Sequence, residues 1–409
     1  MLGDVACDHY RLYKQDIELL KRLNVNSYRF SISWTRIFPD GFGEANLKGV
    51  AFYKEILDLA KKHGVKPVVT LNHWDLPQKL QNIGGWANRE LATHFSNYAK
   101  FCFSTFGNDV DFWGTHNEPW VVAFMGYFVG THPPGIKDIS TALLATHHLL
   151  LGHGMAVKAY RELNLKGKIG ITLDYSYNIA ETEKQEDLDA AKRLNDKHHP
   201  WFADPILLGK YPEMIWNWYK SKGIVMPEIK EGDMKIISTP IDYLGLNYYQ
   251  TDKVKYNPDG WWPYETNTLK REYGKAKNFG MEPEGLYSIL KDLDKRYHRI
   301  PIIITENGYN DDHDNVDFNG EVVDNKRIEY IFAHIKVCKK AIDDGVNLQG
   351  YTVWTLMDSY EWGEWSRMGL VHTDFKTLRR NVYSGHINKL GRSKLTWHLF
   401  AMDAPTRSF

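Results

Sequence analysis

Two glutamates end strand-like apolar runs, and each stands beside an asparagine. Glu118 follows Asn117 in THNEPW, and Glu306 precedes Asn307 in IITENG. Two carboxyl groups that meet at roughly 5 Å can cleave a glycosidic bond, because one attacks the sugar carbon while the other protonates the leaving oxygen. The acid must be kept neutral by apolar or like-charged surroundings, and the nucleophile kept ionised by cations and donors. One such glutamate alone is more often a solvated or salt-bridged residue, so the matching pair carries the indication.

The elements that must position this pair alternate along the chain. Apolar runs of strand composition are separated by stretches with helical spacing, and no region contains strands alone, which predicts an α/β fold with parallel strands. The expected strands are 27–38, 66–74, 111–118, 168–175, 242–249, 300–308 and 348–356. The expected helices are 12–24, 46–64, 90–107, 147–163, 283–293 and 326–344.

Polar clusters at the strand ends favour a closed TIM (β/α)8 barrel over an open sheet. A barrel builds its site from several strand ends, whereas an open sheet concentrates the site at one crevice. The stretches 200–240 and 250–282, rich in Trp, Tyr and Pro, are expected to be long loops over this face. Because no linker or repeat interrupts the pattern, residues 1–409 are expected to form one barrel domain. The clusters are His73-Trp74, Asn117-Glu118, Asn247 and Glu306-Asn307.

The overall composition argues against several classes of function. Lys+Arg and Asp+Glu both number 51, so no net field attracts nucleic acid or an acidic membrane. Aromatic residues form 14% of the chain; flat aromatic faces suit sugar rings, although most of these residues should be core. No run is long enough to span a bilayer, and the N-terminus lacks the pattern of a secretion signal. We therefore expect a cytoplasmic protein without nucleic-acid or membrane partners, and we leave homo-oligomer formation open.

Metal and cofactor motifs are also missing from the sequence. Cys7, Cys102 and Cys338 form no CxxC pair, and the histidines of 147–153 lack the spacing of a helical zinc site. The segment 315–326 begins like a calcium loop but ends on a lysine instead of a bidentate glutamate, so an acidic surface loop is expected there. We expect no cofactor and no metal.

Six motifs, taken together, resemble glycoside hydrolase family 1, the β-glucosidase-type retaining glycosidases. They occur in the family's order from about residue 3 to about residue 375, and six in order are far more specific than any one. The resemblance implies a TIM barrel that hydrolyses terminal β-D-glucosides, with galactosides and fucosides as further candidates, by double displacement through a covalent glycosyl-enzyme. Its partner would be a small β-glucoside or an oligosaccharide. The motifs are YRFSISWTRIFP, TLNHWDLP, THNEPW, LGLNYY, IITENGY and WTLMDSYEW.

The resemblance also implies roles for individual residues. Glu118 becomes the acid/base and Glu306 the nucleophile. Arg29 and Tyr249 would flank Glu306, where a guanidinium keeps a carboxylate ionised. The residues implied in substrate binding are His73, Trp74, Asn117, Asn247, Trp354, Glu361, Trp362 and Trp120.

Plain structural alternatives exist for some of these residues. Arg29 can be part of a structural ion pair, His73 a neutral core histidine, and Trp120 a packing residue instead of a platform for the leaving group. The pair Glu361-Trp362 points to a non-phosphorylated sugar, because a carboxylate that accepts two hydroxyls also repels a phosphate. A 6-phospho-β-glycosidase is therefore disfavoured.

The sequence departs from the family pattern at both ends. The family begins earlier, with a first barrel strand and a glutamine that binds the outer sugar hydroxyls, and the tail after VHTDFKT is atypical. A seven-stranded sheet would leave unpaired edges beside the strands of Arg29 and Trp354. Either the sequence is a fragment, or another segment or chain fills the gap. The alternative function is a non-catalytic or weakly active sugar-binding protein on an incomplete barrel, and the preferred leaving group is not indicated.

Overall fold

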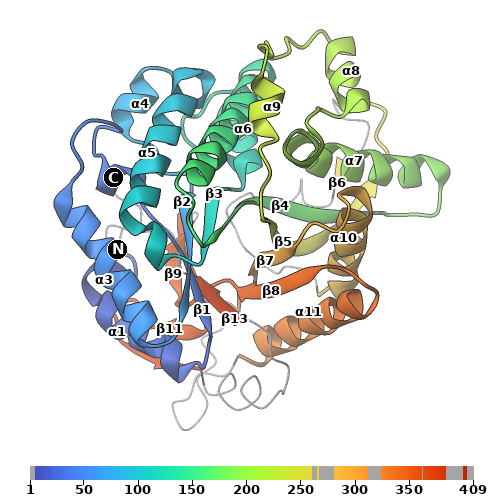
Figure 1. Cartoon of the computed structure of the whole chain (residues 1–409). Coiled ribbons are helices and arrows are strands. Elements are labelled where there is room, and N and C mark those ends of the chain that lie inside the picture. Colours follow the sequence, from blue (N-terminus) through green and yellow to red (C-terminus); the bar gives the residue numbers. More distant parts are fainter. Residues whose placement is uncertain are drawn as a thin grey trace.

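A ring of parallel strands lies at the centre of the folded molecule, and helices surround it (Figure 1). This computed structural model describes residues 5–259, 265–266, 281–311, 324–361, 363–383 and 399–402. The strands that the sequence predicts are β1 (Ser27–Ser31), β2 (Lys66–Asn72), β3 (Phe112–Asn117), β4 (Lys168–Ala180), β5 (Tyr243–Lys255), β7 (Ile302–Asn307) and β8 (Leu348–Val353). Shorter strands are β6 (Glu265–Thr266), β9 (Ser359–Glu361), β10 (Glu364–Ser366), β11 (Val371–Thr373) and β12 (Arg380–Val382).

The described part of the sheet closes on itself. The strand order is β4-β3-β2-β1-β13-β8-β7-β5, and β4 pairs in parallel with β5. The position between β1 and β8, which the seven predicted strands leave open, is taken by β13 (Leu399–Met402), parallel to both neighbours. The prediction of a TIM barrel is therefore confirmed, and a segment far along the chain pairs with the edges that were expected to be unpaired.

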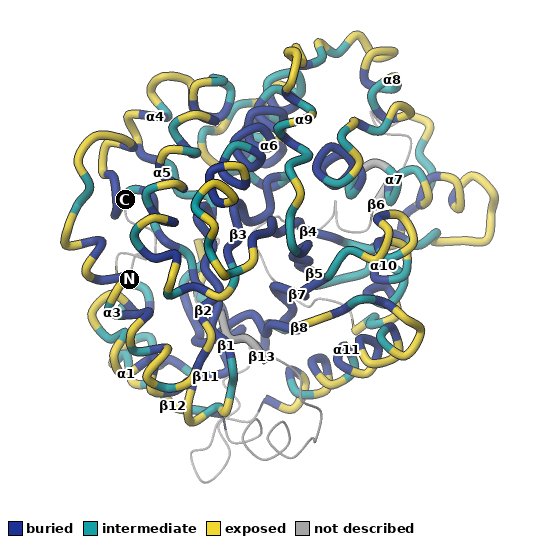
Figure 2. Tube along the Cα trace, viewed as in Figure 1, coloured by how far each residue is buried: buried dark blue, intermediate teal, exposed yellow. Residues whose placement is uncertain are grey.

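Most of the helices have a buried side and a solvent-exposed side, as the burial colours of Figure 2 show. Two of them start at side-chain caps: Asn46 accepts from the amide of Lys48 at 3.2 Å, and Asp138 from that of Thr141 at 2.7 Å. The helices are α1 (His9–Arg22), α2 (Trp34–Ile37), α3 (Leu47–Lys62), α4 (Gln78–Asn82), α5 (Glu90–Phe106), α6 (Ile139–Glu162), α7 (Gln185–Leu208), α8 (Glu213–Ser221), α9 (Asp233–Ile237), α10 (Pro283–Arg296) and α11 (Asn325–Asp343). A π-helix covers Val121–Val129.

Two predicted elements are wrong. The expected strand 27–38 ends at Ser31, and a short helix follows in which Trp34 is fully buried and stacks on Tyr98 at 5.0 Å. The expected loop 200–240 is largely helical, because α7 runs through two prolines to Leu208 and α8 and α9 follow.

Burial explains why α7 tolerates its prolines. A proline inside a helix costs about 3 kcal/mol or more. The adjacent Trp201 and Phe202 are each only 2% exposed, and a fully buried large apolar side chain contributes about 1.5–3 kcal/mol. Most of the second predicted loop, 250–282, and residues 315–323 of the predicted acidic loop lie outside the described residues.

None of the helices in the described ranges has the length and apolar character that crossing a bilayer requires. The same residues contain no group of three His, Cys, Asp or Glu side chains arranged to hold a metal ion. Cys7, Cys102 and Cys338 are buried, and none of them forms a disulfide within the described residues.

Candidate active site

Side chains from four strands meet at the carboxyl ends of the barrel strands. Arg29 lies on β1, Asn117 ends β3 with Glu118 directly after it, Asn247 lies on β5, and Glu306 is the penultimate residue of β7. All five are at most 8% exposed. The two glutamates that the sequence singles out are therefore brought to one buried site.

Both carboxylate oxygens of Glu306 are bound within the protein. Arg29 Nη1 donates to Oε1 at 2.9 Å, and the hydroxyl of Tyr249 donates to Oε2 at 2.8 Å. Burial raises the pKa of Glu306, while the charge of Arg29 and the hydrogen bond of Tyr249 lower it. The phenol remains a donor, since burial and the charge of Glu306 hold the pKa of Tyr249 well above its usual value. These contacts favour the ionised form of Glu306.

Among the described residues, neither a cation nor a phenol is hydrogen-bonded to the Glu118 carboxyl group. The side-chain amide of Asn247 donates to Glu118 Oε1 at 2.8 Å, and Asn247 also lies close enough to Glu306 to lower the pKa of that carboxyl group. Burial raises the pKa of Glu118 well above its usual value, and the negative charge of Glu306 raises it further. When two close carboxyl groups share one proton, it resides on the group with fewer stabilising partners. Here that group is Glu118.

A network of amides and hydroxyls fixes the orientation of the Asn247 side chain. Asn117 Oδ1 accepts from Arg29 Nη2 at 2.8 Å and from Asn247 Nδ2 at 3.2 Å. Asn247 Oδ1 in turn accepts from the hydroxyl of Thr305 at 2.7 Å. The predicted sugar contacts of Asn117 and Asn247 stay predictions, and both side chains serve to position the glutamates.

The sugar-binding residues expected on β2 and β8 line the same end of the barrel. Burial, helped by the charge of Arg29, holds the pKa of His73 well below its usual value, so the ring is neutral. His73 Nε2 pairs with Asn117 Nδ2 at 3.0 Å, and Nδ1 has no hydrogen-bond partner among the residues that the structure describes. The ring of Trp354 lies 6.0 Å from that of His73, and Trp74 Nε1 donates to the carbonyl of Asn117 at 3.0 Å. His73 Nδ1 is thus available to a ligand.

Backbone strain is present at two strand ends. Trp74 has φ of 79° and Glu118 has φ of 47°, in the left-handed region that non-glycine residues rarely adopt. Such strain tends to occur where a site fixes a side chain against its local preference.

The remaining predicted residues have differing surroundings. Glu361 lies on β9, and its buried Oε1 has no hydrogen-bond partner within the described part of the chain. Burial, with a contribution from the charge of Glu306, raises the pKa of Glu361 to about 7. Trp120 packs against Phe124, with 5.5 Å between ring centroids, and against His198 at 4.5 Å. Trp362 lies outside the described residues.

The sequence of this chain matches a protein-family model and several named relatives. The model of Glycosyl hydrolase family 1 matches residues 1–386. The chain belongs to this family. It is 45% identical over 386 residues to "Beta-glucosidase A" of Acetivibrio thermocellus, which covers 93% of this chain and 85% of that protein. It is 44% identical over 384 residues to "Beta-glucosidase A" of Thermotoga maritima, covering 93% and 85% of the two chains.

The fold agrees with solved structures of family 1. A structure described as β-glucosidase from Thermotoga maritima in complex with glucoimidazole superposes with a TM-score of 0.88 at 44% sequence identity. The match covers 94% of this chain and 87% of that one. The two proteins are therefore similar both in fold and in amino-acid sequence.

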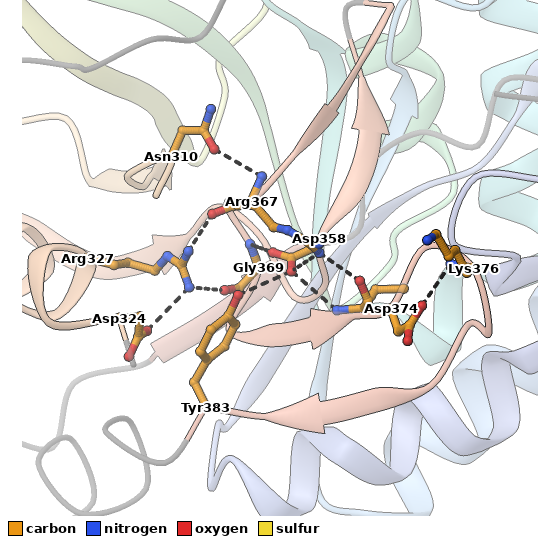
Figure 3. Close-up of polar contacts among 10 residues, drawn as sticks. Asn310, Asp324, Arg327, Asp358, Arg367, Gly369, Asp374, Lys376 and Tyr383 are labelled. Atoms are coloured by element: carbon orange, nitrogen blue, oxygen red, sulfur yellow. Dashed lines mark hydrogen bonds and ion pairs between the residues drawn. The ribbon is translucent and has the colours of Figure 1, made fainter. Parts of the chain in front are cut away.

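One buried charge network in this family 1 chain was missed from the sequence. Asp358 is fully buried and accepts from the amides of Gly369 at 2.9 Å and Thr373 at 3.2 Å and from Arg367 Nη1 at 2.9 Å (Figure 3). Arg327 of α11 donates to the carbonyls of Gly369, at 2.7 Å, and Arg367. The charged side chains of Asp358 and Arg327 therefore stabilise the segment that carries Trp354 and Glu361. A sequence signal existed, because Asp358 and Arg367 lie in the last of the six motifs and its continuation.

Replacing Asp358 with alanine is expected to destabilise the protein by about 3–5 kcal/mol, because Arg367 and Arg327 would stay buried with too little negative charge nearby. Urea unfolding of the parent and the variant measures this difference. The exposed pair Lys339–Asp343 supplies the control: D343N should change the unfolding free energy by less than about 0.5 kcal/mol. Equal effects of D358A and D343N would contradict the role assigned to the network.

Proposed function

We propose that this family 1 protein is a retaining β-glycosidase that hydrolyses terminal β-D-glucosides. The observation that carries the proposal is the asymmetry of the two glutamates. Arg29 and Tyr249 bind Glu306 and favour its charge, while Glu118 accepts from the amide of Asn247 and its pKa is raised, which favours its neutral form. That division is what a nucleophile and a general acid need. The β-glucosidase names of the relatives support the substrate class.

The reaction would proceed in two displacements. Glu306 attacks the anomeric carbon as Glu118 gives its proton to the departing oxygen, which leaves a sugar ester on Glu306. Glu118 then removes a proton from water as the water oxygen bonds to the anomeric carbon, and the electron pair of the ester bond returns to Glu306. The configuration at the anomeric carbon is inverted twice and so retained.

The stereochemistry of the first product tests the proposal. Proton NMR during hydrolysis of p-nitrophenyl β-D-glucoside should show β-glucose first and the α anomer only later, as the product equilibrates. The α-glucoside should not be cleaved. Initial α-glucose would exclude a retaining mechanism, and binding of glucose without any turnover would favour the sugar-binding alternative.

Because of Glu361, the affinity for sugar is expected to depend on pH. Its pKa is raised to about 7, so the carboxyl is neutral below that pH and ionised above it. Since a charged acceptor binds hydroxyls more strongly, a neutral, non-hydrolysable ligand such as methyl 1-thio-β-glucoside should bind roughly tenfold more weakly at pH 6 than at pH 8. Calorimetric titration across this range measures the effect.

Two variants separate this effect from other titrations. E361Q should bind weakly at both pH values and lose the dependence. The exposed Glu364 on the neighbouring strand β10 is the matched control, and E364Q should behave as the parent does. A pH dependence that survives in E361Q would assign it to another group.

A further inference from the structure

A further carboxylate, that of Asp174 within β4, lies near the proposed acid/base. The backbone amide of Glu118 donates to the carbonyl of Thr172 on β4 at 2.9 Å, and Asp174 is two residues further along the same strand. Alternate residues of a strand share a face, so Asp174 and Thr172 point the same way, and the Thr172 hydroxyl lies 3.4 Å from Arg29 Nη2. On the other side, Asp174 is in register with Asn247 of β5. Asp174 thus lies on the strand between β3, which Glu118 directly follows, and β5, which carries Asn247.

The Asp174 carboxylate is held in place by a neighbouring helix. His198 Nε2 of α7 lies 2.9 Å from Asp174 Oδ2, and the two side chains are 15% and 19% exposed. The ring of His198 packs on Trp120, which follows Glu118 by two residues. The carboxylate is therefore a fixed feature of the site and not a mobile surface group.

Charged and titratable groups approach Glu118 and Asp174 from every neighbouring strand. The groups on the side of the nucleophile are Glu306 of β7, Tyr249 of β5 and Arg29 of β1. On the β4 side, His198 and His199 of α7 and Tyr175 adjoin Asp174, and the ring of His199 lies 4.1 Å from that of Tyr175. Asp174 is the carboxylate that β4 contributes to this set.

The negative charge of Asp174, like that of Glu306, raises the pKa of Glu118. Burial is the largest cause that raises the pKa of Glu118, the charge of Glu306 comes second and that of Asp174 third, while Asn247 and Arg29 oppose them. The two charges differ in one respect: the charge of Glu306 disappears when the sugar ester forms, and the charge of Asp174 does not.

We propose that Asp174 is a positioning residue for the second displacement, whose fixed charge keeps Glu118 basic after Glu306 has been esterified. A stronger base removes the proton of water more readily. The inference rests on the proposed function, because it assigns Asp174 to the second step of that reaction. Asp174 itself contacts neither proton nor sugar carbon and acts through Glu118.

The test reads the protonation of Glu118 directly. Protein labelled with ¹³C at the side-chain carboxyl carbon of glutamate is titrated by NMR, and E118Q identifies the resonance of Glu118. In D174N the titration midpoint of Glu118 should fall by at least ~0.5 pH unit. D174E, which restores the charge, should return it towards the parent value, and D174S serves as a second neutral variant should D174N not fold.

The control and the kinetic readout distinguish this role from a structural one. Asp189 is an exposed carboxylate on the same helix as His198, so D189N should leave the midpoint unchanged. In D174N the alkaline limb of kcat/KM should move to lower pH with that midpoint, and D174E should reverse the move. An unshifted midpoint in both neutral variants overturns the inference. A shifted midpoint in a protein that releases no glucose would instead overturn the proposed function and leave the coupling of Asp174 to Glu118 standing.

Discussion

Replacing Glu306 with alanine should lower the hydrolysis of an aryl β-glucoside by on the order of 10⁵-fold, the scale on which enzymes lose activity when their nucleophile is removed. Without this carboxylate no sugar ester can form, although Arg29 and Tyr249 still border the space it leaves. A small anion can enter that space. Sodium azide should therefore restore release of the aryl group, and the sugar product should be α-glucosyl azide, because a single displacement inverts the anomeric carbon.

The control for this variant is a glutamate of similar type outside the site. Glu284 lies exposed on α10, so E284A should keep the parent rate. Product identification by NMR, together with the rate with and without azide, completes the measurement. An E306A protein that folds and hydrolyses the glucoside at the parent rate would remove Glu306 from the reaction.

Replacing Glu118 with alanine should have an effect that depends on the leaving group. General acid–base groups typically contribute 10²–10⁴-fold, so hydrolysis of an alkyl β-glucoside, whose alkoxide leaves poorly, should fall by about 10³-fold. A dinitrophenolate leaves without protonation, so the first displacement of that substrate should remain fast and be followed by slow hydrolysis of the ester. A burst of dinitrophenolate is the expected signal.

The second displacement supplies an independent check on Glu118. Azide needs no general base, so it should accelerate turnover of the dinitrophenyl substrate by E118A and give β-glucosyl azide, opposite in configuration to the product from E306A. The alkaline limb of the pH profile, which reports the loss of the Glu118 proton, should disappear in the same variant. Equal losses for both leaving groups, or an α-configured azide, would contradict the assignment of Glu118 as acid/base.

The sequence by itself determined the elements and the candidate residues that depend on local pattern. Parallel strands covered on both faces read as apolar runs, and the helices between them show their spacing, so the central strands of the barrel were predicted before the structure. Polar residues at the ends of those runs, Glu118 and Glu306 above all, stand out for the same reason. In 200–240 local pattern failed, because burial of Trp201 and Phe202 keeps helix α7 intact through its prolines.

The tertiary structure alone decided which of these residues work together. The contact from Arg29 to Glu306 joins residues 277 positions apart, and that from Asn247 to Glu118 joins residues 129 apart. Three further contacts likewise form only in the folded chain: Asp358 with Arg367, Asp174 with His198, and β13 with β1.

The proposed chemistry depends on two acids from distant strands: a guanidinium and a phenol bind Glu306, whereas Glu118 accepts from the amide of Asn247. Spacing along a sequence reports which side chains share a face, since that follows from the period of a helix or strand. It does not report which strand ends face each other across a barrel, because closure sets those distances, and with them the burial and the charges that divide the roles of the two glutamates.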